Sequence, residues 1–255
     1  MEGRYHSIES FGNVDGPGTR MVLFLQGCPL RCLYCHNADT WLMNDGKTIT
    51  VDEVVTRFEK NQAFYRNGGI TVSGGEPLLQ IEFITELFTK LKAKGIHTCI
   101  DTSGAVYQPG NLHQSEKLKK MLEVTDLLLI DIKHIDTHKN KILTGQPNEH
   151  MLEFIRFVDE QAVSYRIRHV LVPGYSDDEQ DLYQMGKFIG ELKYAKALEV
   201  LPYHSMGENK WDMMGMEYPL KDLEAPSDAV VMRAKELIFK GIADRRLELK
   251  AVITK

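Results

Sequence analysis

Six short apolar runs rich in β-branched residues recur along the chain, and longer segments with apolar residues at helical spacing lie between them. The runs are 19–26, 69–75, 97–104, 126–133, 164–173 and 197–203. Strands that alternate with helices through short connections form a parallel sheet covered by helices. We therefore expect an α/β fold, an incomplete (β/α)6 parallel barrel. Because 255 residues suit one large core, we expect residues 1–255 to form a single domain.

Polar residues stand where several of these predicted strands end. Asp101 and Thr102 end the third strand, and Asp131 and Lys133 end the fourth. Since the carboxyl ends of parallel strands meet at one edge of a sheet, we expect the chemistry of the protein at this edge. Carboxylates in that position fit either a general acid and base or solvated loop residues, and the pattern leaves both open.

Two glycine-rich turns adjoin the first two strands. GNVDGPGTR at 12–20 leads into the first strand, and SGGEP at 73–77 ends the second. Glycines let a ligand approach the backbone closely, and Glu76 adds an anionic acceptor. Either turn can equally be a plain connection between elements.

Local signals predict where some helices begin and end. Thr50 with Glu53, and Ser176 with Glu179, fit the capping box, in which two side chains satisfy backbone N–H groups at the helix start. Gly95 predicts the end of the helix that follows the second strand.

Three segments without either periodicity predict loops, and they are 37–47, 103–111 and 203–228. The last is long enough to suggest a functional cover. The tryptophans and methionines of these loops fit core filler and an adaptable docking surface equally well. They are Trp41, Trp211, Met213, Met214 and Met216.

The net charge of −5 provides no basic field for nucleic acid or an anionic membrane, so we expect neither partner. The first ten residues lack the apolar core of a signal peptide, and no apolar stretch of membrane-spanning length follows. We expect a cytoplasmic monomer. In that reducing compartment, clustered cysteines indicate metal or redox chemistry more often than disulfides.

Three of the four cysteines lie in CPLRCLYCHN, directly after the first strand. Cys28, Cys32 and Cys35 follow the spacing C-x3-C-x2-C, which allows their thiolates to converge on one inorganic centre. One interpretation is a structural zinc site with His36 or Cys99 as the fourth ligand. The other is a cluster of four irons in which three thiolates leave one iron open for chemistry. The spacing alone leaves both open.

CPLRCLYCHN, with Tyr34 before the third cysteine, resembles the signature of radical S-adenosylmethionine (SAM) enzymes. Further similarity lies at 12–20, 71–80, 101–104, 126–133, 172–179 and 201–204, where the chain resembles the family members that activate glycyl-radical enzymes. The resemblance implies the incomplete barrel of the radical SAM type. It also implies that Cys28, Cys32 and Cys35 hold a 4Fe-4S cluster whose fourth iron is chelated by the amino and carboxylate groups of SAM.

The same resemblance implies roles for other residues. Asp101, Thr102 and Asp131 are implied as ligands of a monovalent cation, and Asp15 and Gly16 as contacts to a protein substrate. The residues implied to bind SAM are Tyr34, Cys35, His36, Gly75, Glu76, Asp131, Ile132, Lys133, Arg168 and His204.

The implied activity is reductive cleavage of SAM, after which the 5'-deoxyadenosyl radical removes a hydrogen atom from a glycine of pyruvate formate-lyase. Flavodoxin or ferredoxin is the implied electron donor, and no catalytic residue is expected beyond the cluster and SAM. Two alternatives are a radical SAM enzyme with another substrate and a zinc-stabilised binding module. Cys99 is the only cysteine outside the motif, which disfavours activators with additional clusters; we expect it to be a small buried apolar residue.

Overall fold

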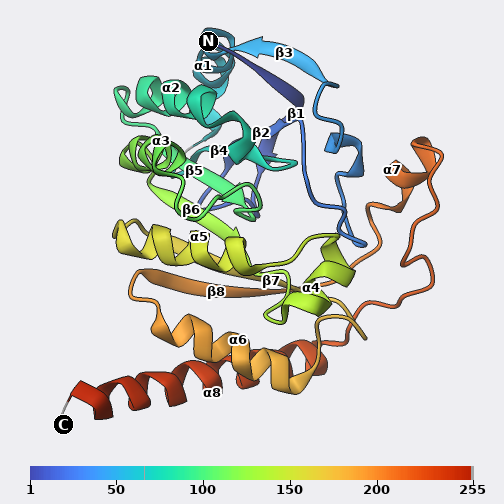
Figure 1. The fold of residues 1–255 in the computed structure, drawn as a ribbon. Helices are drawn as coiled ribbons and strands as arrows, with labels where there is room; N and C mark the ends of the chain where they lie inside the picture. Colours follow the sequence, from blue (N-terminus) through green and yellow to red (C-terminus); the bar gives the residue numbers. More distant parts are fainter. Residues whose placement is uncertain (66, 254–255) are drawn as a thin grey trace.

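The computed structural model describes residues 1–65 and 67–253, which form an eight-stranded sheet with the order β3-β1-β2-β4-β5-β6-β7-β8 (Figure 1). Six consecutive strands of this order, β2 and β4 to β8, pair in parallel, so the predicted α/β fold with six parallel strands is confirmed. The strands are β1 Glu2–Gly12, β2 Arg20–Leu25, β3 Lys47–Thr50, β4 Gly69–Gly74, β5 His97–Thr102, β6 Leu127–Asp131, β7 Tyr165–Leu171 and β8 Ala195–Pro202.

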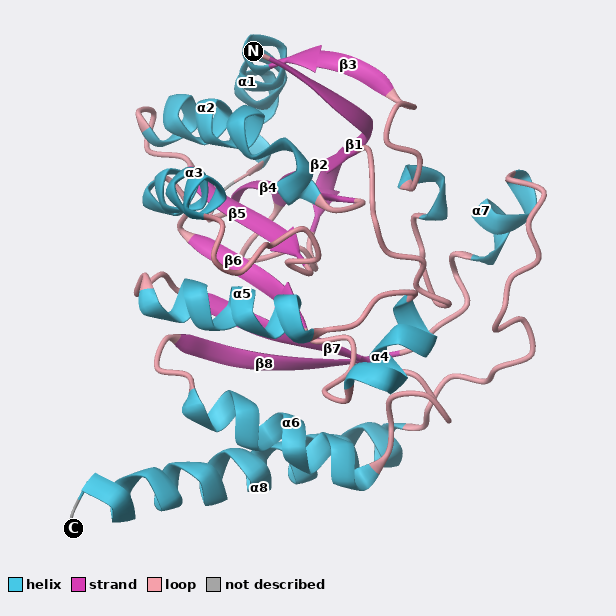
Figure 2. Cartoon of the chain, viewed as in Figure 1, coloured by secondary structure: helices cyan, strands magenta, loops and turns pink. Residues whose placement is uncertain are grey.

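Helices follow most of the parallel strands, and Figure 2 shows α1, α2, α3, α5 and α6 along one side of the sheet. Loops, α4 and α7 lie toward the carboxyl ends of the strands. The helices are α1 Val51–Asn61, α2 Ile81–Lys92, α3 Leu112–Glu123, α4 Thr137–Thr144, α5 Glu149–Glu160, α6 Glu179–Glu191, α7 Glu208–Met213 and α8 Asp228–Ile253. The short 3-10 helices of the described residues are η1 Ala38–Thr40, η2 Gln62–Phe64 and η3 Pro77–Gln80.

Strands β1 and β3 extend the sheet beyond the predicted six. Strand β1 pairs antiparallel with β2 on one side and with β3 on the other. Most β1 side chains are exposed or only partly buried. Because such a strand has no continuous apolar run, its pairing with β2 could not be inferred from the sequence pattern.

The helix-facing side chains of the parallel strands form the main core with the buried faces of the helices. Helix α2 contributes Ile81, Ile84, Phe88 and Leu91, all at most 6% exposed. Each such side chain stabilises the fold by about 1.5–3 kcal/mol relative to an exposed position. The opposite side chains of the same strands point away from these helices and carry most of the polar groups described below.

The predicted helix boundaries are confirmed in two of three places. Thr50 and Glu53 form the capping box of α1. Gly95 has φ +71° just after α2, where the N–H of Ile96 bonds the carbonyl of Leu91 at 3.1 Å. The prediction for Ser176 is wrong, because the N-cap of α6 is Asp178.

Ser176 binds the turn after β7 instead. Its hydroxyl accepts from the N–H of Val172 and donates to the carbonyl of Val170, both at 2.8 Å. A serine two residues before the true cap therefore satisfies the strand end and leaves the helix to begin at Glu179.

The long C-terminal helix α8 packs against α6 through glycines. A side-chain carbon at Gly186 would lie 2.2 Å from the carbonyl oxygen of Ile238 and 3.0 Å from the Cα of Gly241. The two helix backbones can approach this closely only because both positions lack a side chain. Among the described residues, no helix is long and apolar enough to span a bilayer.

Candidate functional site

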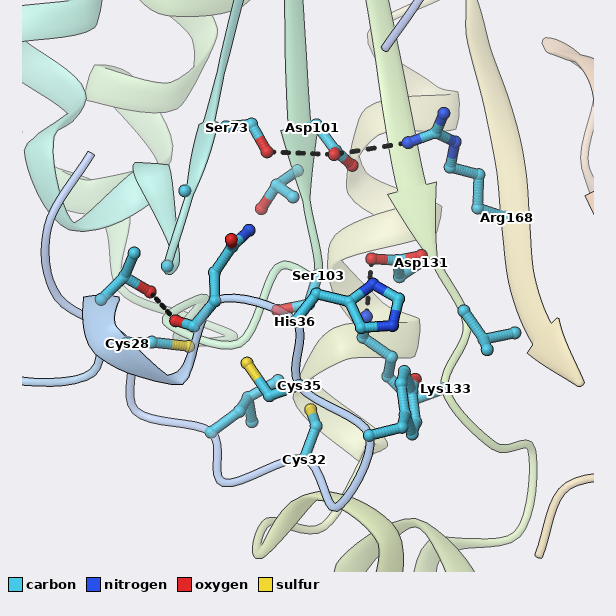
Figure 3. Close-up of a pocket in the computed structure, with 18 of the residues that line it drawn as sticks. Cys28, Cys32, Cys35, His36, Ser73, Asp101, Ser103, Asp131, Lys133 and Arg168 are labelled. Atoms are coloured by element: carbon cyan, nitrogen blue, oxygen red, sulfur yellow. Dashed lines mark hydrogen bonds and ion pairs between the residues drawn. The ribbon is translucent and has the colours of Figure 1, made fainter. Parts of the chain in front are cut away.

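A cavity of about 220 Å³ opens at the carboxyl ends of the parallel strands (Figure 3). The loop after β2 supplies the cysteines of one wall, and the ends of β4, β5, β6 and β7 supply polar side chains for the other. The structure thus brings together most of the predicted site. The predicted residues that line the cavity are Cys28, Cys32, Tyr34, Cys35, His36, Gly75, Asp101, Thr102, Asp131, Lys133 and Arg168.

The loop that carries Cys28, Cys32 and Cys35, here called the cysteine loop, is held by the end of helix α4. The backbone N–H of Arg31 bonds the carbonyl of Thr144 at 2.7 Å, and that of Leu33 bonds the carbonyl of Leu143 at 3.0 Å. These are carbonyls of the last helical turn, which have no partner within the helix. The Arg31 guanidinium also donates to the carbonyl of Cys28 at 2.8 Å, which closes the loop on itself.

The three thiols of this loop turn into the cavity in Figure 3. Burial raises the pKa of the Cys28 and Cys35 thiols and raises that of Cys32 to about 12. Thiols of this kind become thiolates when a metal centre supplies the compensating positive charge. The donor set therefore fits an iron–sulfur cluster, which thiolates bind.

Cys99 lies apart from this loop, on β5, where it packs with Leu127 and Leu129. It is a free, fully buried cysteine, as the sequence predicted. In the described part of the chain, no three His, Cys, Asp or Glu side chains gather around a position for a single metal ion.

Gly74 and Gly75 allow the turn after β4 to lie directly against the end of β2. A side-chain carbon at Gly75 would lie 2.1 Å from the carbonyl oxygen of Gly27, and one at Gly74 would lie 2.2 Å from that of Leu25. The N–H of Gly75 bonds the Leu25 carbonyl at 3.0 Å. The glycines thus serve the contact between two backbones, and Gly75 still lines the cavity.

Glu76 is buried behind the cavity wall, with its carboxylate surrounded by four donors of the protein. One oxygen accepts from the N–H of Leu78 at 3.1 Å and the hydroxyl of Thr102 at 2.5 Å. The other accepts from the N–H and the hydroxyl of Ser103 at 3.1 and 2.6 Å. Glu76 therefore ties the end of β4 to the end of β5 and does not itself line the cavity.

Arg168 on β7 connects three parts of the site. Its guanidinium contacts Asp101 at 3.4 Å and Glu199 at 3.1 Å, and it donates to the carbonyl of Val14. Burial raises the pKa of Asp101 to about 6, although Arg168 opposes this shift. Burial by itself would lower the pKa of Arg168, but Asp101 and its acidic neighbours raise it, so the guanidinium stays charged.

Lys133 and Asp131 form a second ion pair on the cavity wall, at 2.7 Å (Figure 3). The ammonium lies 5.6 Å from the centre of the Tyr34 ring. Burial alone would lower the pKa of Lys133, but Asp131, with Tyr34 and Cys32, raises it well above its usual range. The cavity therefore offers two fixed cations and their carboxylates, which can bind the amino and carboxylate groups of an amino acid.

The hydroxyl of Thr102 is engaged by Glu76, and the carboxylates of Asp101 and Asp131 are engaged by Arg168 and Lys133. Their role as cation ligands stays a prediction. Ile132 is buried, and its backbone bonds β7 through the carbonyl of Arg168 at 2.9 Å.

Loop 203–228 covers the cysteine loop from the outside. The indole N–H of Trp211 donates to the carbonyl of Cys35 at 2.8 Å, and Lys210 donates to Asn37 at 2.8 Å. The rings of His36 and His204 stack at 4.1 Å, so His204 lies behind His36 and does not line the cavity. The predicted cover is thus present.

Some of the aromatic and methionine side chains of these loops belong to the core, and others are exposed as a docking surface would require. Trp211 is buried against Trp41, with ring centres 5.0 Å apart, and acts as core. Met213 is 85% exposed and Met216 38% exposed, so these two are available at the surface.

Asp15 and Gly16 lie in the turn between β1 and β2, next to Arg168 and Arg20. Arg20 and Glu199 take part in the site without having been predicted as functional. Trp211, predicted as core or docking surface, takes part through its indole N–H. Arg20 and Glu199 were not recognised as functional because they lie within predicted strands. Only the contacts of Arg20 with Thr71 and of Glu199 with Arg168, across neighbouring strands, reveal them.

Comparisons with known proteins identify the family of the chain. Residues 14–152 match the family model of the 4Fe-4S single cluster domain. A pyruvate formate-lyase-activating enzyme from Staphylococcus aureus is 48% identical over 245 residues, which is 94% of this chain and 97% of that protein. The chain belongs to the pyruvate formate-lyase-activating enzyme family.

Solved structures agree with this family. A domain of a pyruvate-formate lyase-activating enzyme from Bacteroides vulgatus is 27% identical, with a TM-score of 0.54 over 68% of this chain and 94% of that one. Coproporphyrinogen III oxidase from Escherichia coli, a radical SAM enzyme, shares the fold at 13% identity, with a TM-score of 0.57 over 95% of this chain and 59% of that one. The resemblance to radical SAM activating enzymes is therefore confirmed, and the family model supports a 4Fe-4S cluster over the zinc module. That Cys28, Cys32 and Cys35 hold this cluster stays a prediction.

Proposed function

We propose that this protein activates pyruvate formate-lyase by generating a glycyl radical on it. The observation that carries the proposal is the convergence of Cys28, Cys32 and Cys35 on a cavity whose other wall holds fixed charges of both signs. A cluster bound by three thiolates keeps one iron for SAM, and the charged wall suits the methionine end of SAM. The family relationship supports the same partner.

Held by Cys28, Cys32 and Cys35, the cluster would supply the electron for reductive cleavage of SAM, and this cleavage would provide the radical chemistry that removes a hydrogen atom from the target glycine. The residues of the chain bind SAM, orient it and shield the cavity from water. Arg168 and Lys133 keep their charge in the cavity because their acidic partners raise both pKa values. Glu76 holds the two strand ends at a fixed separation, and such fixed placement is what makes reactions between bound groups fast.

Shielding falls to the loop 203–228 and the cysteine loop. Trp41 and Trp211, each at most 6% exposed, pack beside Cys35 and exclude water from this side of the cluster position. Excluding water strengthens electrostatic interactions in the cavity and protects a reactive radical from side reactions.

Several finer assignments belong to the proposal. We assign Tyr34, Cys35, His36, Gly75, Asp131, Lys133 and Arg168 to the wall of the SAM site, with Ile132, His204 and Glu76 supporting them from outside the cavity. Asp101, Thr102 and Asp131 are assigned to a monovalent cation, and Asp15 and Gly16 to the protein substrate. Flavodoxin or ferredoxin would donate the electron to a cytoplasmic monomer.

The test is anaerobic incubation of the reconstituted protein with SAM, a reductant and pyruvate formate-lyase, with the glycyl radical measured by electron paramagnetic resonance. We expect radical formation with the unmodified protein and with Cys99→Ala, which serves as the control for loss of a buried cysteine. Cys32→Ser should have little iron and no activity. The proposal fails if SAM is cleaved without a radical on pyruvate formate-lyase, or if the isolated protein holds zinc without acid-labile sulfide.

A further inference from the structure

Three backbone carbonyls of the turn between β1 and β2 are each held by a side chain from the sheet. Arg168 donates to the carbonyl of Val14, Thr71 to that of Asp15 at 2.6 Å, and Arg20 to that of Pro17 at 2.9 Å. These donors come from β7, β4 and β2, so the turn is anchored at points that are far apart in the sequence. We call Arg20, Thr71 and Arg168 the cradle of this turn.

Arg20 is fully buried, yet no carboxylate within the described residues lies at ion-pair distance from it. Its guanidinium donates instead to the hydroxyl of Thr71 at 2.7 Å and to the carbonyls of Pro17 and Ile70 at 2.9 and 2.6 Å. Burying a charge without an ionic partner is costly unless its hydrogen bonds are well made. We therefore expect the shape of the turn between β1 and β2, which Arg20 helps to fix, to have a function.

Thr71 is the centre of this arrangement. Its hydroxyl accepts from Arg20, because a guanidinium can only donate, and its own hydrogen therefore goes to the carbonyl of Asp15. The side chain is fully buried and does not line the cavity of the cysteines. Thr71 thus acts on the turn and not on the cofactor site.

The backbone of this turn is fixed by glycines, and the turn leaves a side chain exposed to solvent. Gly16 and Gly18 have φ +127° and +69°, and a side-chain carbon at Gly18 would lie 2.1 Å from the carbonyl oxygen of Asn67. The backbone is thus held from behind, while the side chain of Val14 is 77% exposed. Arg168 extends the cradle to the cavity wall through Asp101.

We propose that Thr71, with Arg20, is a positioning residue that holds this turn in a preformed shape for the glycine-bearing segment of the protein substrate. The proposal rests on the function proposed above, because the turn carries Asp15 and Gly16. A preformed turn binds its partner without first losing conformational freedom. Weakening the cradle should therefore weaken binding of the partner while the reaction at the cofactor site continues.

The experiment compares Thr71→Val, which keeps the shape of the side chain and removes the hydroxyl, with Thr71→Ser, which keeps the hydroxyl. Thr98→Val is the matched control. It removes another fully buried threonine hydroxyl, one that bonds the carbonyl of Val124 at 2.8 Å away from the turn. For each protein we would measure bound iron, cleavage of SAM without partner, and the rate of glycyl-radical formation over a range of pyruvate formate-lyase concentrations.

We expect Thr71→Val to keep its iron and its partner-free cleavage of SAM, and to raise the apparent KM for pyruvate formate-lyase by about tenfold, the equivalent of one hydrogen bond. Thr71→Ser and Thr98→Val should stay within about twofold of the unmodified protein by the same reasoning. Hydrogen exchange of the 13–19 amides should be faster in Thr71→Val alone.

An unchanged KM in Thr71→Val would overturn the proposal, and so would an equal rise in Thr98→Val. A loss of iron or of partner-free cleavage in Thr71→Val would also overturn it, because the effect would then lie at the cofactor site. If the unmodified protein makes no radical on pyruvate formate-lyase, the proposed function fails separately. In that case unchanged exchange in Thr71→Val would show that the cradle does not hold the turn.

Discussion

Replacing Glu76 by glutamine tests whether the buried carboxylate holds the two strand ends together. Each carboxylate oxygen accepts one backbone N–H, from Leu78 on one side and from Ser103 on the other. Hydroxyl donors can rotate and become acceptors, but backbone N–H groups cannot. The amide of Glu76→Gln must therefore turn its NH2 toward one of these two N–H groups in either orientation.

The expected cost follows from those contacts. A hydrogen bond to a charged group contributes about 1.5–3 kcal/mol, and a buried N–H left without a partner costs about 1–3 kcal/mol. A neutral amide is easier to bury than a carboxylate, which offsets part of the sum, so we expect a loss of about 3 kcal/mol in the free energy of unfolding. This remains below the usual stability of about 5–15 kcal/mol, so the variant should still fold.

The assay is reversible urea unfolding of the cluster-free protein, followed by circular dichroism. Glu116→Gln is the matched control, because Glu116 lies on an exposed face of α3 and its substitution should change stability by less than about 0.5 kcal/mol. SAM binding should also weaken in Glu76→Gln, since the turn at Gly75 and the side chain of Ser103 line the cavity. Equal unfolding free energies for the two variants would refute the reasoning.

Three further predictions concern other parts of the site and the core. Asp15→Ala should keep its cluster and bind SAM, yet form the glycyl radical on pyruvate formate-lyase more slowly in time-resolved resonance spectra; equal rates would remove Asp15 from the substrate site. Trp211→Phe should lose the hydrogen bond to the carbonyl of Cys35, worth about 1 kcal/mol, and should release iron to a chelator faster than the unmodified protein; equal release would contradict this. Burial lowers the pKa of His134 and His169 below 6.5, so the unfolded chain takes up protons first and stability should fall as the pH drops through about 6.5. Each histidine contributes up to about 1.4 kcal/mol per pH unit, and urea midpoints that stay constant between about pH 7.5 and 5.5 would refute this.

The strands of the parallel sheet could be predicted because they carry short runs of apolar and β-branched residues, and β2 and β6 are buried on both faces. The gathering of polar strand ends in one cavity could also be predicted, because parallel strands place their carboxyl ends at the same edge of the sheet. Strand β1 could not be predicted, because its polar side chains carry no signal until β2 and β3 provide partners. The N-cap of α6 was predicted wrongly, because the Ser176 hydroxyl accepts from one backbone group of the preceding turn and donates to another.

The supporting residues of the site were hidden for a related reason. Trp211 and Cys35 are 176 positions apart, and Arg168 and Val14 are 154 apart. No local pattern encodes contacts over such separations. Arg20 and Glu199 have the sequence pattern of ordinary strand residues. Only the folded structure shows that the Arg20 guanidinium bonds Thr71 and that Glu199 lies opposite Arg168.

The amino-acid order alone specifies the alternation of strands and helices, the spacing of three thiols after β2, and the edge of the sheet where polar groups gather. Tertiary packing selects which of those groups face the cavity. Glu76 turns away from it because four donors of the surrounding turns satisfy a carboxylate better than an open cavity does. His204 lies behind His36 because the 203–228 loop folds over the cysteine loop, and that contact exists only once distant segments are brought together.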